Sequence, residues 1–227
     1  MSKVFMTINY EGTPNWNLTS LYTESDYAAS ISSYTVAPTT LVALENQLFS
    51  LTNEIKTFPD WPQKGVNFKD IQSILMNPEL AAITSHYLKE LLPKQDSNNF
   101  LFDKILCFDA RGFLFGFDLA KAAGTPMILA RKPGKLPGKV ITQTFEKEYG
   151  LDEIQVQDGL IKPGDRVLIH DDLLATGGTA GAAAEIILKC GAEIAGFNFI
   201  MDLTFLPGRE VLHKYVSDDK IKALLQF

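Results

Sequence analysis

Residues 166–179 restrict the fold of this chain more than any other segment, because they join a strand pattern to a helix pattern through a short glycine turn. Val167, Leu168 and Ile169 form an apolar run that is typical of a buried strand. The alanine-rich run from Ala180 to Lys189 predicts a helix. Strand and helix patterns alternate from Leu101 onward. We therefore expect an α/β fold with a parallel, doubly wound sheet that binds ligands at the carboxyl ends of its strands.

The turn between this strand and helix has the features of an anion site. Two glycines allow backbone angles that point successive N–H groups inward at a helix N-terminus, and two threonines add hydroxyl donors. The spacing fits neither the Walker pattern nor the dinucleotide fingerprint. The sequence predicts a phosphate site formed by Ala175, Thr176, Gly177, Gly178 and Thr179.

Two acids, Asp171 and Asp172, come directly before this turn, where they would repel a bare phosphate. A ribose 5-phosphate satisfies both features, because its 2- and 3-hydroxyls can donate to the carboxylates while its phosphate lies in the turn. The same carboxylates would stabilise positive charge that develops on the sugar. We therefore predict that both acids are catalytic groups acting on a ribose 5-phosphate.

The run from Val167 to Thr179 resembles the phosphoribosyl diphosphate (PRPP) motif of type I phosphoribosyltransferases, and its second half is close to the adenine phosphoribosyltransferase form. An ordinary strand, turn and helix is the alternative interpretation. The resemblance implies the fold of that family, with a small hood beside the sheet. It also implies transfer of 5-phosphoribosyl from PRPP to adenine, giving AMP and pyrophosphate in purine salvage. A phosphoribosyltransferase for another purine base, or a non-catalytic PRPP-sensing regulator, is the alternative function.

Two further segments resemble base and pyrophosphate elements of the same enzymes. Residues 58–70 resemble the segment that enters the hood, which implies adenine contacts from Val66, Phe68 and Lys69; Phe68 as a core aromatic is the alternative. Residues 109–116 resemble the pyrophosphate loop, which implies that Arg111 lies near both the purine and the diphosphate. The resemblance also places a non-proline cis peptide at Asp109–Ala110.

A basic loop follows the predicted strand at residues 127–130. Arg131, Lys132 and Lys135 are three cations within five residues, well placed to bind a diphosphate at a strand end, and their string also resembles the family; a solvated basic loop is the alternative. Magnesium would be carried mainly by PRPP and pyrophosphate, because Mg²⁺ binds largely through substrate oxygens, and no protein metal ligand is predicted.

The remaining predicted site residues lie in two separate segments. Residues 138–160 are polar and punctuated by glycine, and the resemblance implies a mobile hairpin that closes over the reactants. Glu148 matches a family glutamate proposed to manage a purine proton, which makes it the third predicted catalytic residue; a solvated loop glutamate is the alternative. Residues 202–210 resemble a family segment that would make Leu203 a wall of the base pocket. His170 stands where an aliphatic residue is common, and we predict a packed, hydrogen-bonded histidine.

Composition limits the partners and the compartment. The 227 residues carry a net charge of −6, with 46% apolar and 21% charged residues, which predicts no binding to nucleic acid or membrane. Cys107 and Cys190 predict two buried thiols and a cytoplasmic protein. We divide the chain into an N-terminal extension, residues 1–40, and a domain of residues 41–227 with a hood at about 56–75. The family tendency predicts a homodimer.

Overall fold

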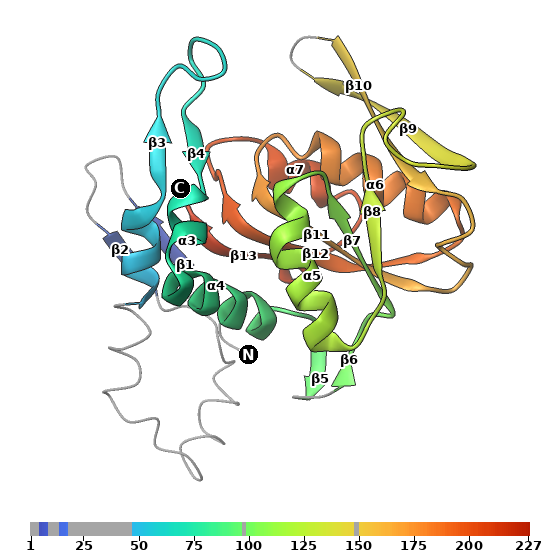
Figure 1. The fold of residues 1–227 in the computed structure, drawn as a ribbon, viewed down its shortest axis with the longest axis horizontal. Coiled ribbons are helices and arrows are strands. Elements are labelled where there is room, and N and C mark those ends of the chain that lie inside the picture. Colours follow the sequence, from blue (N-terminus) through green and yellow to red (C-terminus); the bar gives the residue numbers. More distant parts are fainter. Residues whose placement is uncertain (1–4, 9–13, 18–46, 97–98, 148–149) are drawn as a thin grey trace. The chain divides into compact units, whose positions relative to one another are not determined.

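Two compact units, residues 1–86 and 87–227, make up the chain. The structure, a computed structural model, describes residues 5–8, 14–17, 47–96, 99–147 and 150–227 (Figure 1). None of the helices in these ranges combines the length and apolar character needed to cross a bilayer.

The first unit contains short antiparallel strand pairs and helices. Strand β1 pairs with β2, and β3 pairs with β4. The bounds are β1 (Phe5–Ile8), β2 (Pro14–Asn17), β3 (Lys56–Phe58), β4 (Phe68–Asp70), α3 (Gln72–Met76) and α4 (Pro78–Glu90), which continues into the second unit. Residues 47–54 are helical, within the range 41–55 for which apolar residues at every third or fourth position predict a helix; residues 41–46 lie outside the described residues. The predicted extension at residues 1–40 therefore contains the strand pair β1–β2, whose aromatic and branched residues favour strands.

The second unit is built around a five-stranded sheet in the order β13-β12-β11-β7-β8, with every neighbouring pair parallel. Helices connect the strands, so the predicted α/β fold is confirmed. The strands are β7 (Lys104–Phe108), β8 (Met127–Ala130), β11 (Arg166–Leu174), β12 (Glu193–Asp202) and β13 (Ile221–Gln226), and the helices are α5 (Arg111–Ala123), α6 (Gly178–Lys189) and α7 (Gly208–Leu212). Two smaller pairs, β5 (Lys94–Asp96) with β6 (Asn99–Phe100) and β9 (Val140–Lys147) with β10 (Gly150–Gln157), and the 3-10 turn η1 (Asp218–Lys220) complete the unit.

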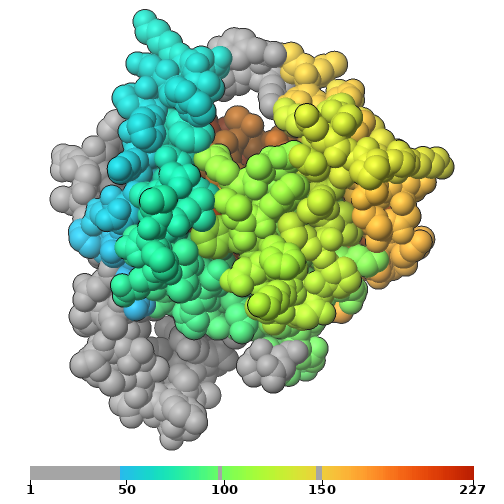
Figure 2. Space-filling view, viewed as in Figure 1, coloured from blue at the N-terminus to red at the C-terminus, as the bar shows by residue number. Residues whose placement is uncertain are grey.

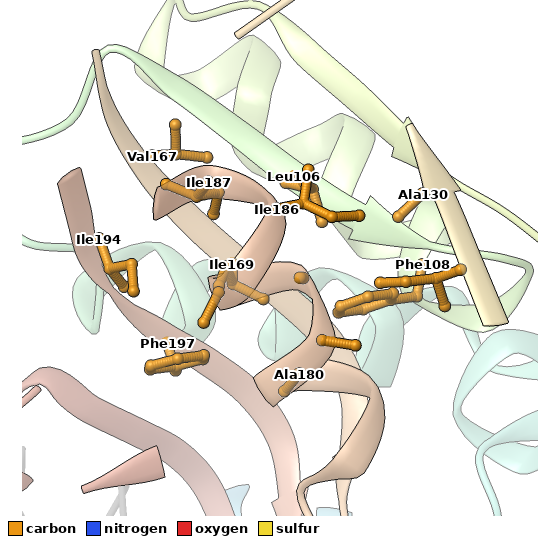
Figure 3. Packing of buried hydrophobic residues seen from close by; sticks show 14 of the residues in the cluster. Leu106, Phe108, Ala130, Val167, Ile169, Ala180, Ile186, Ile187, Ile194 and Phe197 are labelled. Atoms are coloured by element: carbon orange, nitrogen blue, oxygen red, sulfur yellow. The ribbon is translucent and has the colours of Figure 1, made fainter. Parts of the chain in front are cut away.

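The main core lies between the sheet and α6 (Figure 3). Small side chains, including the fully buried Ala183 and Ala184, let the helix approach the sheet closely, and branched residues fill the space between them. The cluster includes Leu106, Phe108, Val167, Ile169, Ile186, Ile187 and Phe197. This packing holds the carboxyl ends of β7, β8 and β11 in one rigid edge.

Strand β11 is longer than the apolar run predicts, and its length decides where the acids lie. It runs from Arg166 to Leu174 because its second half stays paired with β12, with Asp171 opposite Phe199 and Leu174 opposite Asp202. The two acids therefore belong to the strand itself. The sheet ladder fixes their backbones, which a loop would not do.

The hairpin of β9 and β10 is attached to the same unit by its base. Ile154 and Val156 are buried in the core, and Arg131 and Gln155 exchange two backbone hydrogen bonds of 2.9 and 2.7 Å. Figure 1 shows the hairpin in yellow, and residues 148–149 lie outside the described residues. The predicted hairpin is present, and its mobility stays a prediction.

Candidate active site

A cleft of about 190 Å³ lies at the carboxyl ends of β7, β8 and β11. It brings together six of the predicted site residues: Arg111, Arg131, Lys132, Asp171, Asp172 and Thr179. Asp109, Phe145 and Asp152, which were not predicted as site residues, also line it. Lys135, Ala175, Thr176, Gly177, Gly178 and Leu203 are not among its lining residues.

Asp172 is buried and Asp171 is half-buried, and their surroundings raise the pKa of both carboxyls. Asp172 is 4% exposed, and its Oδ2 lies 2.9 Å from Arg111 Nε without accepting a hydrogen bond. Burial raises the pKa of Asp172, which the Arg111 charge opposes; burial, and then the Asp172 charge, raises the pKa of Asp171 well above its ordinary value. The pair therefore favours keeping a proton, and a nearby positive charge would favour its release.

Gly112 lets the start of α5 approach Asp171. A Cβ atom on Gly112 would lie 2.7 Å from Asp171 Oδ1 and 3.2 Å from its Cα. The Oδ1 atom accepts a hydrogen bond from the Asp172 N–H at 2.9 Å. Only a residue without a side chain fits here, although the sequence signal, a glycine directly after Arg111, is too common to identify this contact.

The predicted phosphate loop begins α6 two residues earlier than the alanine run indicates. Gly177 is the N-cap with φ of +79°, and its carbonyl accepts the Gly181 N–H at 2.8 Å. A side chain on Gly177 would meet Gly208 O at 2.8 Å, and one on Gly178 would meet Phe145 Cδ2 at 3.0 Å. The loop is thus a tightly packed glycine turn at a helix N-terminus, which is the geometry that binds anions through backbone N–H groups.

The basic loop after β8 is held by carboxylates. Arg131 Nε donates to Asp109 Oδ2 at 2.9 Å, and Lys132 Nζ donates to Asp152 Oδ2 at 2.5 Å. Arg131 Nη1 also donates to the backbone oxygen of Lys135 at 3.1 Å, which shapes the loop. Both cations of the basic loop that line the cleft therefore have acidic partners. The Asp109–Ala110 peptide beside them is cis, as predicted.

One cross-strand pair of the hairpin contacts both halves of the site. Phe145 and Asp152 lie opposite each other in the β9–β10 register. Phe145 packs near Gly178 of the phosphate loop, and Asp152 pairs with Lys132 of the basic loop. Sequence patterns could not reveal this, because the register of the hairpin decides which side chains share a face.

A buried polar row lies one position before the acids. Cys107, His170 and Asn198 are aligned on β7, β11 and β12, and all three are fully buried. Asn198 Nδ2 donates to Leu88 O at 3.3 Å, so its Oδ1 accepts from His170 Nδ1 at 2.9 Å. Burial lowers the pKa of His170 to about 4 and raises that of the Cys107 thiol. The predicted packed histidine is confirmed, and the row does not supply a nucleophile.

Other predicted residues lie elsewhere in the structure. The prediction of two buried thiols is wrong for Cys190, which is partly exposed at the end of α6. Glu148 lies outside the described residues. Leu203 is 6% exposed, and its N–H donates to Leu174 O at 2.9 Å, beside the phosphate loop. In the described ranges no three His, Cys, Asp or Glu side chains are grouped as metal ligands.

The predicted adenine contacts Val66, Phe68 and Lys69 belong to the first unit. Phe68 begins β4 and meets Trp61 edge to face, with ring centroids 4.5 Å apart. Lys69 Nζ donates to Thr57 Oγ1 at 3.0 Å, and burial lowers the pKa of Lys69. Val66 accepts the Trp61 N–H at 3.1 Å. These contacts order the β3–β4 hairpin, and the part of this hairpin in binding adenine stays a prediction.

A parallel sheet with an acid pair and glycine loop on one strand end and a basic loop on another is the arrangement of a phosphoribosyltransferase. Residues 70–220 match the family described as "Phosphoribosyl transferase domain". The adenine phosphoribosyltransferase of Syntrophotalea carbinolica is 44% identical to this chain over 177 residues, covering 78% of this chain and 98% of that protein.

Solved structures agree with these sequence matches. The adenine phosphoribosyltransferase from Thermoanaerobacter pseudethanolicus is 37% identical, with a TM-score of 0.73 over 79% of this chain and 99% of that chain. The Trypanosoma brucei enzyme, solved with AMP, pyrophosphate and ribose-5-phosphate, is 26% identical, with a TM-score of 0.70 over 85% of this chain and 81% of that chain. This chain belongs to the adenine phosphoribosyltransferase family, which confirms the family predicted from its motifs.

Proposed function

We propose that this protein transfers the 5-phosphoribosyl group of PRPP to adenine, giving AMP and pyrophosphate. The observation that carries the proposal is that the acid pair, Thr179 of the glycine loop, and Arg131 and Lys132 line one cleft. A sugar that carries a phosphate at one end and a diphosphate at the other matches this order of groups.

The glycine loop would bind the 5-phosphate of the sugar. Residues 175–179 supply the N-terminus of α6, where free N–H groups and the helix dipole favour an anion. Thr179 lines the cleft and adds a hydroxyl donor. Because the turn is already shaped by close packing, phosphate binding would need little reorganisation.

The acids would bind the ribose and stabilise the reacting carbon. Asp172 lines the cleft, and its buried Oδ2 lies 2.9 Å from Arg111 Nε without accepting a hydrogen bond, so a turn of the side chain toward the cleft would let it accept a ribose hydroxyl. As the C1–O bond to the diphosphate loosens, positive charge grows on the sugar while the base nitrogen approaches the opposite face. Negative charge on Asp171 and Asp172 would stabilise that charge, and the developing cation would in turn lower the pKa of the pair.

The basic loop would bind the diphosphate by exchanging partners. Arg131 would turn from Asp109, and Lys132 from Asp152, toward the phosphate oxygens, while Lys135 approaches from the exposed side of the loop. Arg111 would remain between the acid pair and the diphosphate. Each exchange replaces one ion pair with another, so the net gain depends on the higher charge of the diphosphate.

Magnesium fits this site as a companion of the substrate. The described residues offer no ready group of three metal ligands, whereas PRPP and pyrophosphate carry many oxygens. When bound, the ion would neutralise charge on the leaving diphosphate. Among the described residues, the carboxylates that line the cleft are the acid pair, Asp109 and Asp152.

Val66, Phe68, Lys69, Arg111 and Leu203 are the proposed adenine contacts, on their likeness to the family. Glu148 is proposed to manage the proton of the purine. We further propose a cytoplasmic homodimer that binds neither nucleic acid nor membrane. The outer face of α5 supports self-association, because Leu114 and Phe117 are 50% and 66% exposed there; α5 forms part of the surface in Figure 2.

The proposed function is tested by a turnover assay. PRPP and magnesium are offered with adenine, guanine or hypoxanthine separately, and nucleotide formation is followed. We expect AMP from adenine and no product from the other two bases. Product from another base would overturn the base assignment, and PRPP binding without product would identify a PRPP-sensing protein.

A further inference from the structure

The segment from Asp202 to Glu210, which resembles the family over its whole length, is used by the proposed function only at Leu203. The structure shows a second feature in it. Helix α7, which starts at Gly208, packs directly behind the phosphate loop. A Cβ atom on Gly208 would lie 2.3 Å from Ala175 O and 2.8 Å from two carbon atoms of Leu174. A side chain at this position would therefore displace the loop.

The contact between α7 and the loop is reciprocal. A Cβ atom on Gly177 would lie 2.8 Å from Gly208 O and 3.0 Å from Val211 Cβ. A Cβ atom on Gly181 of α6 would lie 3.4 Å from Val211 Cγ1. The first turn of α7 thus touches the loop, and neither Gly208 nor Val211 lines the cleft.

A buried ion pair anchors α7 to the sheet. Arg209 Nε donates to Asp202 Oδ2 at 2.6 Å, and Asp202 is 1% exposed at the end of β12. Arg209 Nη1 also donates to Asp218 Oδ1 at 2.7 Å, and His213 Nε2 lies 3.0 Å from the same oxygen. The guanidinium therefore ties the helix to the sheet on one side and to η1 on the other.

These contacts link the sheet to the phosphate loop through Asp202, Arg209 and Gly208. We infer that Asp202 and Arg209 are positioning residues that hold Gly208 against Ala175 and so set the backbone geometry of residues 175–179 for the 5-phosphate of PRPP. None of the three touches substrate in this assignment. The inference rests on the proposed function, because it assigns the phosphate of PRPP to this loop.

A substitution at Gly208 can distinguish this positioning role from a general contribution to protein stability. Gly208 is the first residue of a helix and does not have a positive φ, so alanine suits its backbone at least as well as glycine. Any loss in Gly208→Ala then comes from the close approach to Ala175 and Leu174. A purely structural helix would tolerate the change by a small shift without any effect on substrate affinity.

The experiment compares Gly208→Ala and Arg209→Met with the wild-type enzyme. We measure the KM for PRPP, the KM for adenine and kcat, each per mole of folded protein, and ribose 5-phosphate binding by calorimetry. We expect the KM for PRPP and the Kd for ribose 5-phosphate to rise by about tenfold to a hundredfold, since misplacement by about 1 Å carries costs of this order. The KM for adenine should change by less than about twofold.

Arg166→Met is the matched control. Arg166 also pairs with an aspartate, Asp103, at 2.8 Å, but at the amino end of β11 and on the surface. Its removal should leave both KM values unchanged. Arg209→Lys should recover part of the PRPP affinity, because a lysine can still pair with Asp202.

Arg209→Met leaves Asp202 buried without a partner and could fail to fold for that reason. In that case the double variant Asp202→Asn/Arg209→Met, which removes both charges, takes the place of Arg209→Met in the experiment. Unchanged PRPP and ribose 5-phosphate affinities in folded Gly208→Ala and Arg209→Met would overturn the inference. A wild-type protein that neither binds ribose 5-phosphate nor makes AMP would overturn the proposed function instead, so the two failures are distinguishable.

Discussion

The two strand ends proposed to bind the phosphate and the diphosphate are built in opposite ways. At the end of β11, Asp172 is buried and the glycine loop is closely packed, because a Cβ atom added to Gly177 or Gly178 would lie only 2.8 or 3.0 Å from a neighbouring atom. At the end of β8, the groups are long side chains, and Lys132 is 57% exposed while paired with Asp152. Backbone shapes the first end, and exchangeable ion pairs shape the second.

The difference indicates how binding energy is used at each end. The β11 end is organised before substrate arrives, so its interactions can act fully in the transition state. The β8 end must exchange partners, so its contribution is a difference between two ion pairs and is sensitive to salt. We expect substitutions at the buried end to have large effects on rate or stability, and those at the exposed end to have small, salt-dependent effects.

The largest effect is expected for Asp171→Asn. The change keeps the shape of the side chain but removes the charge that would stabilise the developing sugar cation. We expect kcat to fall by about a hundredfold to a thousandfold, with a much smaller change in PRPP affinity. Steady-state kinetics together with direct PRPP binding measure both. Asp103→Asn is the control, and equal losses in rate and affinity would contradict the assigned role.

The buried end should also respond to pH through His170. Its pKa is about 4 in the folded protein, against an ordinary 6.5, so the unfolded chain binds more protons between these values. Neutral His170 therefore makes its full contribution to the free energy of unfolding above about pH 6.5. This contribution, about 3 kcal/mol in total, is lost as the pH falls toward 4.

Denaturant unfolding of the wild type and His170→Gln from pH 4 to 7.5 measures this effect. The glutamine amide can still donate to Asn198 but does not titrate in this range. Asp171 and Asp172 are present in both proteins, so the difference between the two curves isolates His170. If the free energy of unfolding of the two proteins changed with pH in parallel, His170 would not be the group that controls stability at acidic pH.

A smaller effect is expected for Gly177→Ala. The alanine would take a φ of +79° and would meet Gly208 O at 2.8 Å, so the phosphate loop must move. We expect the KM for PRPP to rise by about tenfold or more. Gly164→Ala is the control, because Gly164 has a φ of +82° and open space around its Cβ position. If the KM for PRPP rose similarly in both variants, backbone strain alone would explain the effect of Gly177→Ala.

The smallest effect is expected at the exposed end. Asp152→Asn removes the partner of Lys132 and a negative charge beside the diphosphate. Pyrophosphate inhibition should strengthen by about twofold to fivefold at low salt, and the gain should shrink as salt rises. Asp158→Asn is the control, since Asp158 pairs with Lys139 at 3.2 Å outside the cleft lining. A gain that does not depend on salt would argue against ion-pair exchange.

Sequence reasoning predicted the fold and the composition of the site better than its contacts. The strand at residues 127–130 is as expected, because a short apolar run between turn signals is a local feature. The acid pair, Arg111, Arg131 and Lys132 were predicted from motifs, and the cleft brings them together. Asp109 and Asp152 were not predicted, because a carboxylate partner of a cation depends on which strands and hairpins become neighbours.

The sequence by itself determined the alternating strand and helix order, the glycine turn and the family. These depend on local backbone preferences and on the residue pattern along the chain. Only the tertiary structure decided that β11 extends through both acids, that Phe145 and Asp152 share one side of the hairpin, and that Gly208 lies against Ala175. Strand pairing, hairpin register and helix packing join residues 7 to 33 positions apart, and no local pattern encodes the distance between such residues.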